Sequence, residues 1–213
     1  MEKTKNRTCF ITIEGGEGAG KSTLINKIKE FLFSKGIDCI LTREPGGTPV
    51  GEKIRDIVLH KGSSSLKMSA LTEFSLFLAS RAEHVEEVIK PALKANKVVI
   101  CDRFNDSSWV YQGYVRGLDI NKVELFCDFA AQGIKPNLTL FLDIDPSLGF
   151  KRIEKKELDR IEKEKIDFHQ KVREGYHLLA KKEPNRFFIL DATKKPDEIF
   201  QEAKELIICC LKI

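Results

Sequence analysis

The sequence contains Gly15-Gly16-Glu17-Gly18-Ala19-Gly20-Lys21-Ser22, which matches the pattern G-x-x-x-x-G-K-[ST] of a phosphate-binding loop. The apolar, β-branched run at residues 9–13 lies just before this loop and predicts a buried strand. Residues 23–32 follow it and place their apolar side chains on one face of a helix. A strand, a glycine-rich loop and a helix in this order predict a nucleotide-binding site rather than a chance turn.

The residue types in this loop suit the binding of a nucleotide. Glycines let successive backbone N–H groups turn toward phosphate oxygens, and the N-terminus of the following helix adds partial positive charge. Lys21 can reach the β- and γ-phosphates, and the hydroxyl of Ser22 can ligand Mg²⁺, so we expect ATP and Mg²⁺ as cofactors. The expected ATP-binding residues are Gly15, Gly16, Glu17, Gly18, Ala19, Gly20, Lys21, Ser22 and Thr23.

Further strand-like runs separated by helical patterns predict the rest of the fold. The runs cover residues 37–42, 97–101, 138–143 and 186–190. With the first strand they predict an α/β fold of five parallel strands flanked by helices, in one domain over residues 1–213. Ligands of such sheets bind at the carboxyl ends of the strands, where Arg43-Glu44, Asp102-Arg103 and Asp143 also fall.

The composition excludes several classes of partner. The net charge is +4, and no stripe of Lys and Arg interleaved with aromatic residues occurs, so we expect no nucleic-acid partner. No apolar run approaches membrane-spanning length, and the polar stretch at residues 1–7 has no apolar signal region. The six cysteines form no C-x-x-C pair, which favours buried thiols in a reducing compartment. We therefore expect a cytoplasmic protein.

A long charged stretch from residue 146 to about residue 182 has a helical pattern, with a possible break near residues 157–159. If it is helical, Arg152, Lys156 and Arg160 are four residues apart and share a face. These cations could face a bound phosphate. Alternatively, they belong to a solvated helix face laced by ion pairs, since acidic residues are interleaved with them.

A phosphate-binding loop alone does not choose between a GTPase, a motor ATPase and a small-molecule kinase. A GTPase should carry N-K-x-D to recognise guanine. The nearest string, Asn121-Lys122-Val123-Glu124, lacks the aspartate and falls in a helical pattern. No D-x-x-G switch motif is evident, which disfavours a GTPase.

Several further motifs resemble those of the bacterial thymidylate kinase family, over nearly the whole chain. They are EGGEGAGKST at residues 14–23, TREPGG at 42–47, ASRAEH at 79–84, DRF at 102–104 with DSS at 106–108 and YQG at 111–113, and LDRIE at 158–162. The resemblance implies a P-loop nucleoside monophosphate kinase fold with a lid. In it, residues 15–22 form the P-loop, residues of about 43–116 form the acceptor-binding helices, and residues of about 151–162 form the lid.

The resemblance also implies a thymine site. Phe77 and Arg81 share a helix face, where an aromatic ring can stack on a pyrimidine and a guanidinium can bind its carbonyl edge. The family's matching Phe and Arg hold thymine, Ser108 and Gln112 contact the base, and Tyr111 crowds the sugar and disfavours a ribose. Alternatively, Phe77 belongs to the ordinary packing of the core. Ser108, Tyr111 and Gln112 could likewise form a solvated helix face.

Other residues are candidates for binding the sugar and the phosphate of the acceptor. Arg103 directly follows a buried strand and could clamp the acceptor phosphate, while Asp102 could hold Mg²⁺ or its water. The resemblance implies that Glu17 contacts the 3′-OH of the acceptor and that Glu44 and Arg55 lie on the acceptor side. The plainer alternatives are that Asp102 and Arg103 form a salt-bridged strand end and that Arg55 is a solvated charge on a helix.

The P-loop carries no basic residue at Glu17-Gly18-Ala19, whereas some thymidylate kinases place an arginine there. The chain is similar to the class in which the lid supplies the catalytic arginine, so the expected catalytic residues are Lys21, Arg103, Arg152 and Arg160. Arg152 is the first candidate in the lid and Arg160 the second. The expected reaction is ATP-dependent phosphorylation of dTMP to dTDP by a homodimer. The alternatives are another nucleoside monophosphate kinase or a non-enzymatic nucleotide switch.

Overall fold

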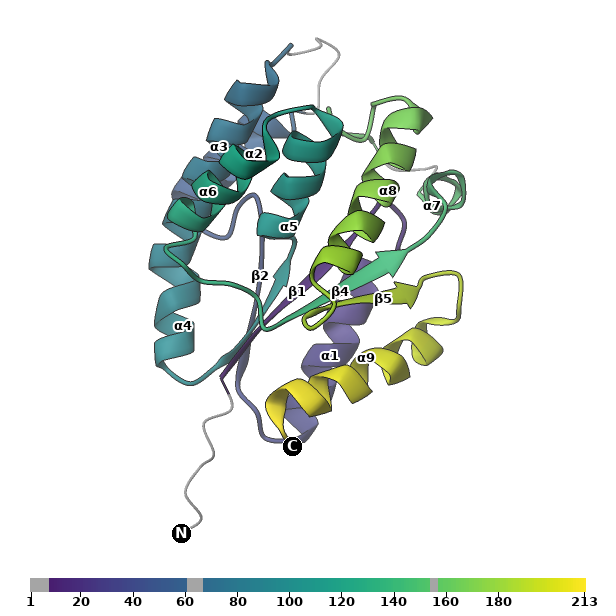
Figure 1. Ribbon diagram of the computed structural model, residues 1–213. Coiled ribbons are helices and arrows are strands. Elements are labelled where there is room, and N and C mark those ends of the chain that lie inside the picture. The colour runs from purple at the N-terminus through teal and green to yellow at the C-terminus, as the bar shows by residue number, and fades with distance from the viewer. Residues whose placement is uncertain (1–7, 61–66, 154–156) are drawn as a thin grey trace.

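The computed structural model describes residues 8–60, 67–153 and 157–213. A central sheet carries helices on both faces (Figure 1). The strands are β1 (Cys9–Gly15), β2 (Cys39–Arg43), β3 (Val98–Asp102), β4 (Leu138–Asp143) and β5 (Phe187–Asp191). They are all parallel, in the order β2-β3-β1-β4-β5. This confirms the predicted α/β fold with a five-stranded parallel sheet.

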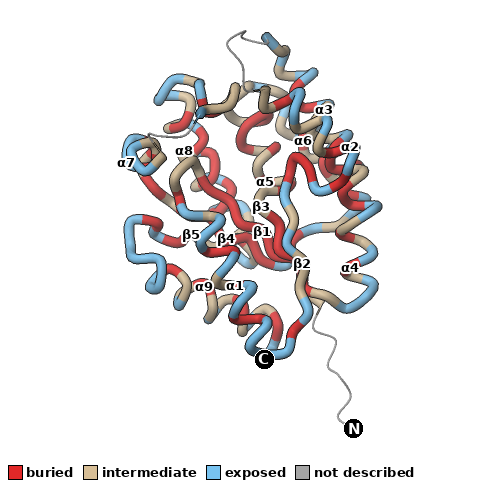
Figure 2. Tube along the Cα trace, turned by 180° about the vertical axis from the view of Figure 1, so that it is seen from behind, coloured by how far each residue is buried: buried red, intermediate tan, exposed pale blue. Residues whose placement is uncertain are grey.

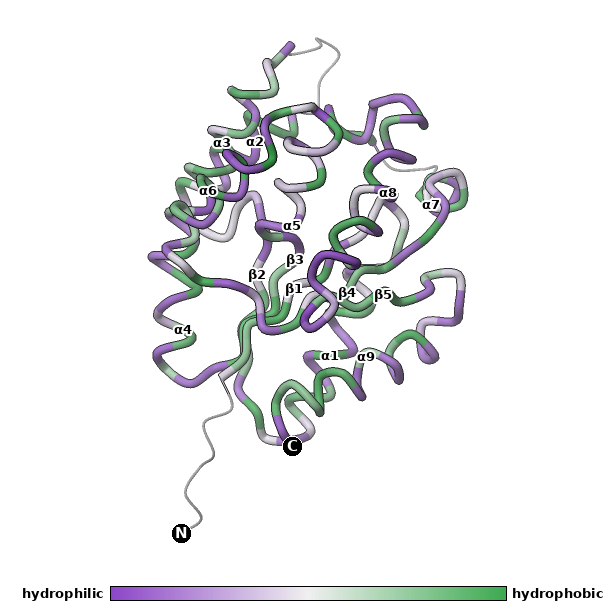
Figure 3. The backbone as a smooth tube through the Cα atoms, viewed as in Figure 1, coloured by the Kyte–Doolittle hydropathy of each residue, from purple (hydrophilic) through white to green (hydrophobic). Residues whose placement is uncertain are grey.

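The central strands are apolar along almost their whole length because both faces of the sheet are covered. β1 lies between β3 and β4, with Ile11 opposite Ile100 on one side and Leu138 on the other. The edge strands β2 and β5 are only partly buried. The burial view shows this contrast between the centre and the rim of the molecule (Figure 2), and the hydropathy view shows the same apolar centre (Figure 3).

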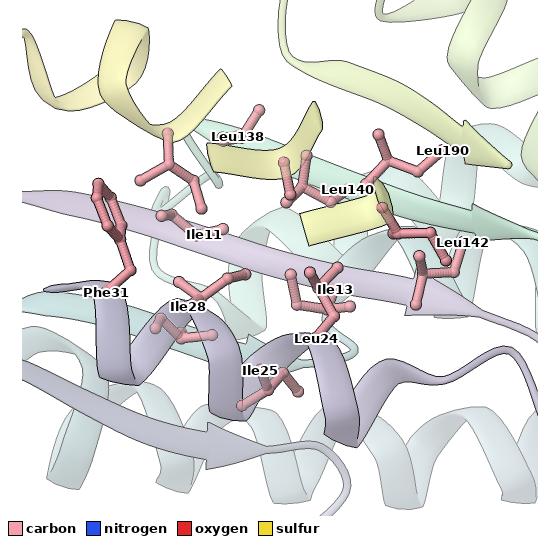
Figure 4. Packing of buried hydrophobic residues seen from close by; sticks show 14 of the residues in the cluster. Ile11, Ile13, Leu24, Ile25, Ile28, Phe31, Leu138, Leu140, Leu142 and Leu190 are labelled. Carbon is pink, nitrogen blue, oxygen red and sulfur yellow. The ribbon is translucent and has the colours of Figure 1, made fainter. Parts of the chain in front are cut away.

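One face of the sheet packs against α1 (Lys21–Ser34) and α9 (Pro196–Leu211). Ile11 and Ile13 of β1 meet Leu24 and Ile28 of α1 in this core (Figure 4). All four side chains are buried, and each buried aliphatic side chain stabilises the fold by about 1.5–3 kcal/mol. Because α1 starts directly after the P-loop, this packing also holds the loop at the end of β1.

The remaining helices lie over the opposite face and the carboxyl end of the sheet. They are α2 (Pro49–Val58), α3 (Ala70–His84), η1 (Val85–Ile89), α4 (Lys90–Lys94), α5 (Asn105–Ser108), η2 (Trp109–Val115), α6 (Ile120–Ala130), α7 (Pro146–Arg152) and α8 (Ile166–Lys182). Here η1 and η2 are π-helical turns. Two buried clusters join η1 and α4, and then η2 and α8, to the sheet. Within the described ranges, no helix is both long and apolar enough to cross a membrane.

The predicted helix over residues 69–94 is helical throughout but not uniform. α3 passes into the π-turn η1 before Pro91, which is the second residue of α4. Proline has no N–H to donate, and the wider π-turn is the local adjustment next to it. Pro91 therefore changes the helix without shortening it.

The helical stretch predicted over residues 146–182 is interrupted at the possible break near residues 157–159, and the interruption is wider than expected. α7 ends at Arg152, α8 begins at Ile166, and residues 157–165 contain no helix. The Oδ1 atom of Asp159 accepts hydrogen bonds from the N–H groups of Ile161 and Glu162, and Oε2 of Glu162 accepts one from the N–H of Asp159. This reciprocal cap forms a local turn that competes with helix continuation.

The common helical face predicted for the lid cations is consequently not formed. Arg152 is the last residue of α7, whereas Arg160 lies in the turn after Asp159. Lys156 lies outside the described residues, as does the part of the predicted lid at 154–156. The two arginines are therefore held by different elements.

Candidate active site

A cleft of about 1230 Å³ opens at the carboxyl ends of the strands. It is lined by the P-loop, the segment after β2, helices α2 and α3, the segment after β3, and the start of the chain that follows α7. The sequence-predicted residues along it are Glu17, Gly18, Ala19, Gly20, Lys21, Ser22, Thr23, Glu44, Arg55, Phe77, Arg81, Asp102, Arg103, Ser108, Tyr111, Gln112 and Arg152. Gly15, Gly16 and Arg160 do not line it.

The P-loop takes its shape from glycines. Gly18 and Gly20 have φ angles of 67° and 93°, a left-handed conformation that side chains rarely adopt. The Nζ atom of Lys21 folds back along the loop and donates to the carbonyl oxygens of Gly15 at 3.1 Å and Gly16 at 3.0 Å. Burial lowers the pKa of Lys21, and the nearby charge of Arg103 lowers it further. A bound phosphate would restore an anionic partner to this lysine.

Asp102 and Ser22 both line the cleft with side chains that carry oxygen atoms. Asp102 ends β3, and its Oδ1 atom is buried without a hydrogen-bond partner among the described residues. The side chain of Ser22 stands at the start of α1 and also lines the cleft. A carboxylate and a hydroxyl oxygen match the hard oxygen ligands that Mg²⁺ prefers, so these residues fit a magnesium ion.

A cluster of buried, ion-paired side chains surrounds Arg81 in the cleft. Arg81 is only 1% exposed, and its Nε atom donates to Glu44 at 2.7 Å. The other oxygen of Glu44 meets Nδ1 of His84 at 3.0 Å, and the guanidinium also donates to Ser108 at 3.1 Å. Removing a charge from such a buried pair is costly, because the remaining charge has no solvent. Glu44 therefore holds Arg81, a contact that the sequence pattern did not predict.

Arg103 lies between the P-loop and the acceptor side. Its φ angle of 70° is left-handed, and its guanidinium donates to Glu17 at 3.2 Å and lies over the ring of Tyr111. It also donates to Ser107 and to Tyr176 of α8. The position of this guanidinium is thus set by groups from several elements.

Glu14 lies beneath Arg103, at the end of β1, and sequence reasoning missed it. It is fully buried and accepts hydrogen bonds from the N–H of Phe104, the hydroxyl of Ser107 and the hydroxyl of Tyr176. Burial raises the pKa of Glu14 to about 7, against the lowering effect of the Arg103 charge. The available signal was an acidic residue inside an otherwise apolar strand, immediately before the P-loop.

The pyrimidine-site candidates do converge on the cleft. Phe77 is half-buried and lines the cleft beside Arg81, rather than being closed inside the core. Ser108, Tyr111 and Gln112 are buried and line it from α5 and η2. Their predicted common face is formed across a junction between an α-helix and a π-turn.

Glu73 of α3 is a second carboxylate that sequence reasoning missed. It is 1% exposed and accepts hydrogen bonds from Gln112 at 2.9 Å and from Arg160 at 2.6 Å. Arg160 also donates to the carbonyl of Val58 at 2.9 Å. Its guanidinium is therefore bound to α2 and α3 and does not reach the P-loop in this structure.

Arg152 behaves differently from Arg160. It lines the cleft and donates to the carbonyl oxygens of Gly18 at 3.3 Å and Ala192 at 3.0 Å. Helix α7 itself packs on the P-loop, because a Cβ atom at Gly149 would lie 2.2 Å from the carbonyl oxygen of Glu17. Backbone contact between α7 and the loop keeps Arg152 beside the donor site.

On the acceptor side of the P-loop, Arg55 of α2 donates to the carbonyl of Pro45 at 2.8 Å. Burial lowers the pKa of Arg55, and the nearby charge of Arg43 lowers it further. The guanidinium is thus half-buried in the cleft wall rather than solvated, which disagrees with the plainer interpretation of this residue.

Comparison with known proteins agrees with this geometry. The family model described as thymidylate kinase matches residues 13–203. The thymidylate kinase of Protochlamydia amoebophila is 48% identical, with 97% of this chain and 95% of that protein covered, and that of Clostridium novyi is 48% identical with 93% and 98% covered. The crystal structure of thymidylate kinase from Ehrlichia chaffeensis matches with a TM-score of 0.75 at 31% identity, covering 94% of this chain and 98% of that one. The chain therefore belongs to the thymidylate kinase family, whose reaction is the phosphorylation of dTMP to dTDP.

Proposed function

We propose that the chain, as one domain over residues 1–213, transfers the γ-phosphoryl group of ATP to dTMP within this single cleft. The observation that carries the proposal is that the P-loop and the buried Arg81 cluster line the same cavity of about 1230 Å³. An oxygen of the dTMP phosphate attacks the γ-phosphorus, the bond to the β,γ-bridging oxygen breaks, and ADP leaves with that oxygen. Phosphoryl transfer of this kind depends on positioning and charge stabilisation rather than on a protein nucleophile.

On the donor side, the backbone N–H groups of residues 15–23 cradle the ATP phosphates, and Lys21 binds the β- and γ-phosphates. Ser22 and Asp102 would hold Mg²⁺, which would neutralise charge on the phosphates when bound. The orphaned buried oxygen of Asp102 supports this assignment.

On the acceptor side, Phe77 stacks on thymine, and Arg81 donates to a carbonyl oxygen of the base. Ser108 and Gln112 contact the base edge, and Tyr111 excludes a ribose 2′-OH. The burial of Arg81 and its fixed contacts to Glu44 and Ser108 support a preorganised site.

The sugar and phosphate of the acceptor lie between the base site and the P-loop. Glu17 accepts a hydrogen bond from the 3′-OH, while Arg103 and Arg55 bind the phosphate. Glu44 acts on the acceptor side through Arg81. Arg103 is held at the junction by Glu17 and Tyr176, which supports its role as the clamp.

The lid supplies the cation that the P-loop lacks, and we assign Arg152 to this role. An added cation over the transferring group contributes about 10³–10⁵ in rate. Arg152 lies beside the P-loop at Gly18, whereas Arg160 is engaged by Glu73 and Val58. Arg160 would have to leave both partners to reach the phosphates, so it is the second candidate.

The chain also forms a homodimer in this proposal, through the exposed face of α6. Phe129 is 81% exposed and Leu125 is 65% exposed, with Phe126 beside them. Light scattering should give the mass of two chains for the wild type and of one chain for Phe129→Asp. A wild-type mass of one chain contradicts this assignment.

All six cysteines are free thiols, which supports a cytoplasmic location.

A coupled ADP-release assay with ATP and Mg²⁺ tests the function. The acceptors compared are dTMP, dUMP, the ribose form of TMP, dCMP, dGMP and AMP. We expect the highest kcat/KM with dTMP, less with dUMP, and very little with the ribose form because of Tyr111. A preference for a purine monophosphate would indicate another nucleoside monophosphate kinase. Slow turnover that is independent of any acceptor would indicate a nucleotide switch.

A further inference from the structure

Glu73 joins three segments that are far apart in the sequence. Its carboxylate accepts hydrogen bonds from Nε2 of Gln112 at 2.9 Å, from the guanidinium of Arg116 at 3.4 Å, and from Nη2 of Arg160 at 2.6 Å. Gln112 lies within η2, Arg116 directly follows it, and Arg160 lies in the turn between α7 and α8. None of the steps proposed above uses this buried acid, so its contacts require an explanation of their own.

The partners of Glu73 keep it ionised. Burial acts to raise the pKa of Glu73, but the hydrogen bond from Gln112 and the charges of Arg116 and Arg160 hold the pKa below its ordinary value. An ionised carboxylate has no proton to donate and only accepts hydrogen bonds. It can therefore face the NH₂ end of a carboxamide but not its oxygen end.

This restriction determines how the Gln112 amide presents itself to the cleft. The NH₂ group is engaged by Glu73, which leaves the carbonyl Oε1 as the free end of a buried side chain that lines the cleft beside Arg81 and Ser108. The two ends of a carboxamide have opposite hydrogen-bonding character. We propose that Glu73 is a positioning residue that fixes Gln112 with its oxygen toward the acceptor base, and so selects a base that presents an N–H group there.

The chemistry of pyrimidines turns this orientation into specificity. Thymine and uracil carry an N3–H donor between two carbonyl groups, whereas N3 of cytosine is an acceptor beside an amino group. An amide oxygen hydrogen-bonds to N3–H of thymine but confronts a second acceptor in cytosine. A mismatch that leaves buried polar groups unpaired is strongly disfavoured. The inference rests on the proposed function, in which Gln112 contacts the base, and deepens it to discrimination against dCMP.

The variant Glu73→Gln tests the inference through the ratio of kcat/KM for dTMP to that for dCMP. A carboxamide at position 73 can donate as well as accept, so the Gln112 amide is free to turn. We expect this ratio to fall about tenfold, which corresponds to ~1.4 kcal/mol, or one hydrogen bond. The ratio of dTMP to dUMP should stay unchanged, because both bases carry N3–H. A merely structural defect would lower all three activities together.

A reciprocal exchange separates orientation from general damage. In the double variant Glu73→Gln with Gln112→Glu, the carboxylate at position 112 can only accept, so an acceptor again faces the base. The preference for dTMP over dCMP should return to within about threefold of the wild type. Glu124→Gln is the matched control, because Glu124 is a partly buried acid that pairs with Trp109 outside the cleft. It should leave the ratio unchanged.

The outcomes distinguish failure of this inference from failure of the proposed function. If the wild type does not phosphorylate dTMP, the proposed function is wrong. If the wild type is active and folded Glu73→Gln keeps the wild-type ratio, the positioning role is overturned. If Glu73→Gln does not fold, as judged by its thermal melt, the exchange variant decides. Retained preference in that variant supports the role, and lost preference contradicts it.

Discussion

On the donor side of the cleft, left-handed glycines shape the P-loop, and Lys21 folds back onto the carbonyls of the same loop. On the acceptor side, Arg81 is held by Glu44, and Gln112 by Glu73, each from another element. The proposed donor site is thus built largely from consecutive residues and backbone, whereas the proposed acceptor site is built from buried polar groups about 40 residues apart. A short motif can encode the first arrangement, but the second exists only once the fold has formed.

The largest expected effect concerns Arg152, which the proposed donor site takes from outside its motif. Arg152→Met should lower kcat about 10³-fold or more, because the charge that develops on the transferring phosphoryl loses its cation. Arg160→Met should lower kcat less and reduce thermal stability, since Arg160 pairs with Glu73. Steady-state kinetics at saturating ATP and dTMP measure both. A larger loss of kcat in folded Arg160→Met would reverse our assignment.

A substitution in the buried pairs of the acceptor side should instead lower the stability of the protein. Glu44→Gln leaves the buried guanidinium of Arg81 without its carboxylate, and we expect it to lower the free energy of unfolding by about 3–5 kcal/mol. Urea denaturation measures this loss. Asp197→Asn, which breaks an exposed pair with Lys27, is the control and should have no measurable effect. Equal effects of both substitutions would show that the buried pair of Glu44 and Arg81 contributes no more to stability than an exposed pair.

The sequence predicted the strand, the P-loop and the helix of the proposed donor side for the same reason. Strand, loop and helix are contiguous there, so periodicity and glycine positions were enough, and the alternation of elements predicted the parallel sheet. The acceptor side chains were predicted by family resemblance, but their partners Glu73 and Glu14 were missed, because no local pattern shows which distant charge a buried acid will meet. The common helical face predicted for the lid cations was wrong for another reason, since the cap at Asp159 interrupts the helical pattern of charges close to the break suggested near residues 157–159.

Glu14 lies at the boundary between the two halves and gives a pH test. Its folded pKa is about 7, above the ordinary value of 4.5, so the folded state holds a proton that the unfolded state loses. The stability contributed by this proton is complete below pH 4.5 and is lost as pH rises through about 7, which amounts to ~3 kcal/mol. Urea titrations from pH 5 to 8 should show this decline in the wild type and a flatter profile in Glu14→Gln. Parallel profiles would exclude Glu14 as the titrating group.

The smallest change tests whether backbone contact really builds the donor site. Gly149→Ala adds one methyl group, 2.2 Å from the carbonyl oxygen of Glu17, so α7 or the P-loop must shift. A displacement of about 1 Å near reacting groups can lower the rate about 100-fold, and we expect a 10- to 100-fold fall in kcat/KM for ATP. The KM for dTMP should change less than that for ATP, because the buried pairs of the acceptor side are untouched and only Glu17 of the proposed acceptor contacts lies at the clash. Leu148→Ala, at an exposed position of the same helix, is the control. If Gly149→Ala instead raised the KM for dTMP as much as that for ATP, the two sides of the cleft would form one mechanical unit, and their different construction would not make them independent.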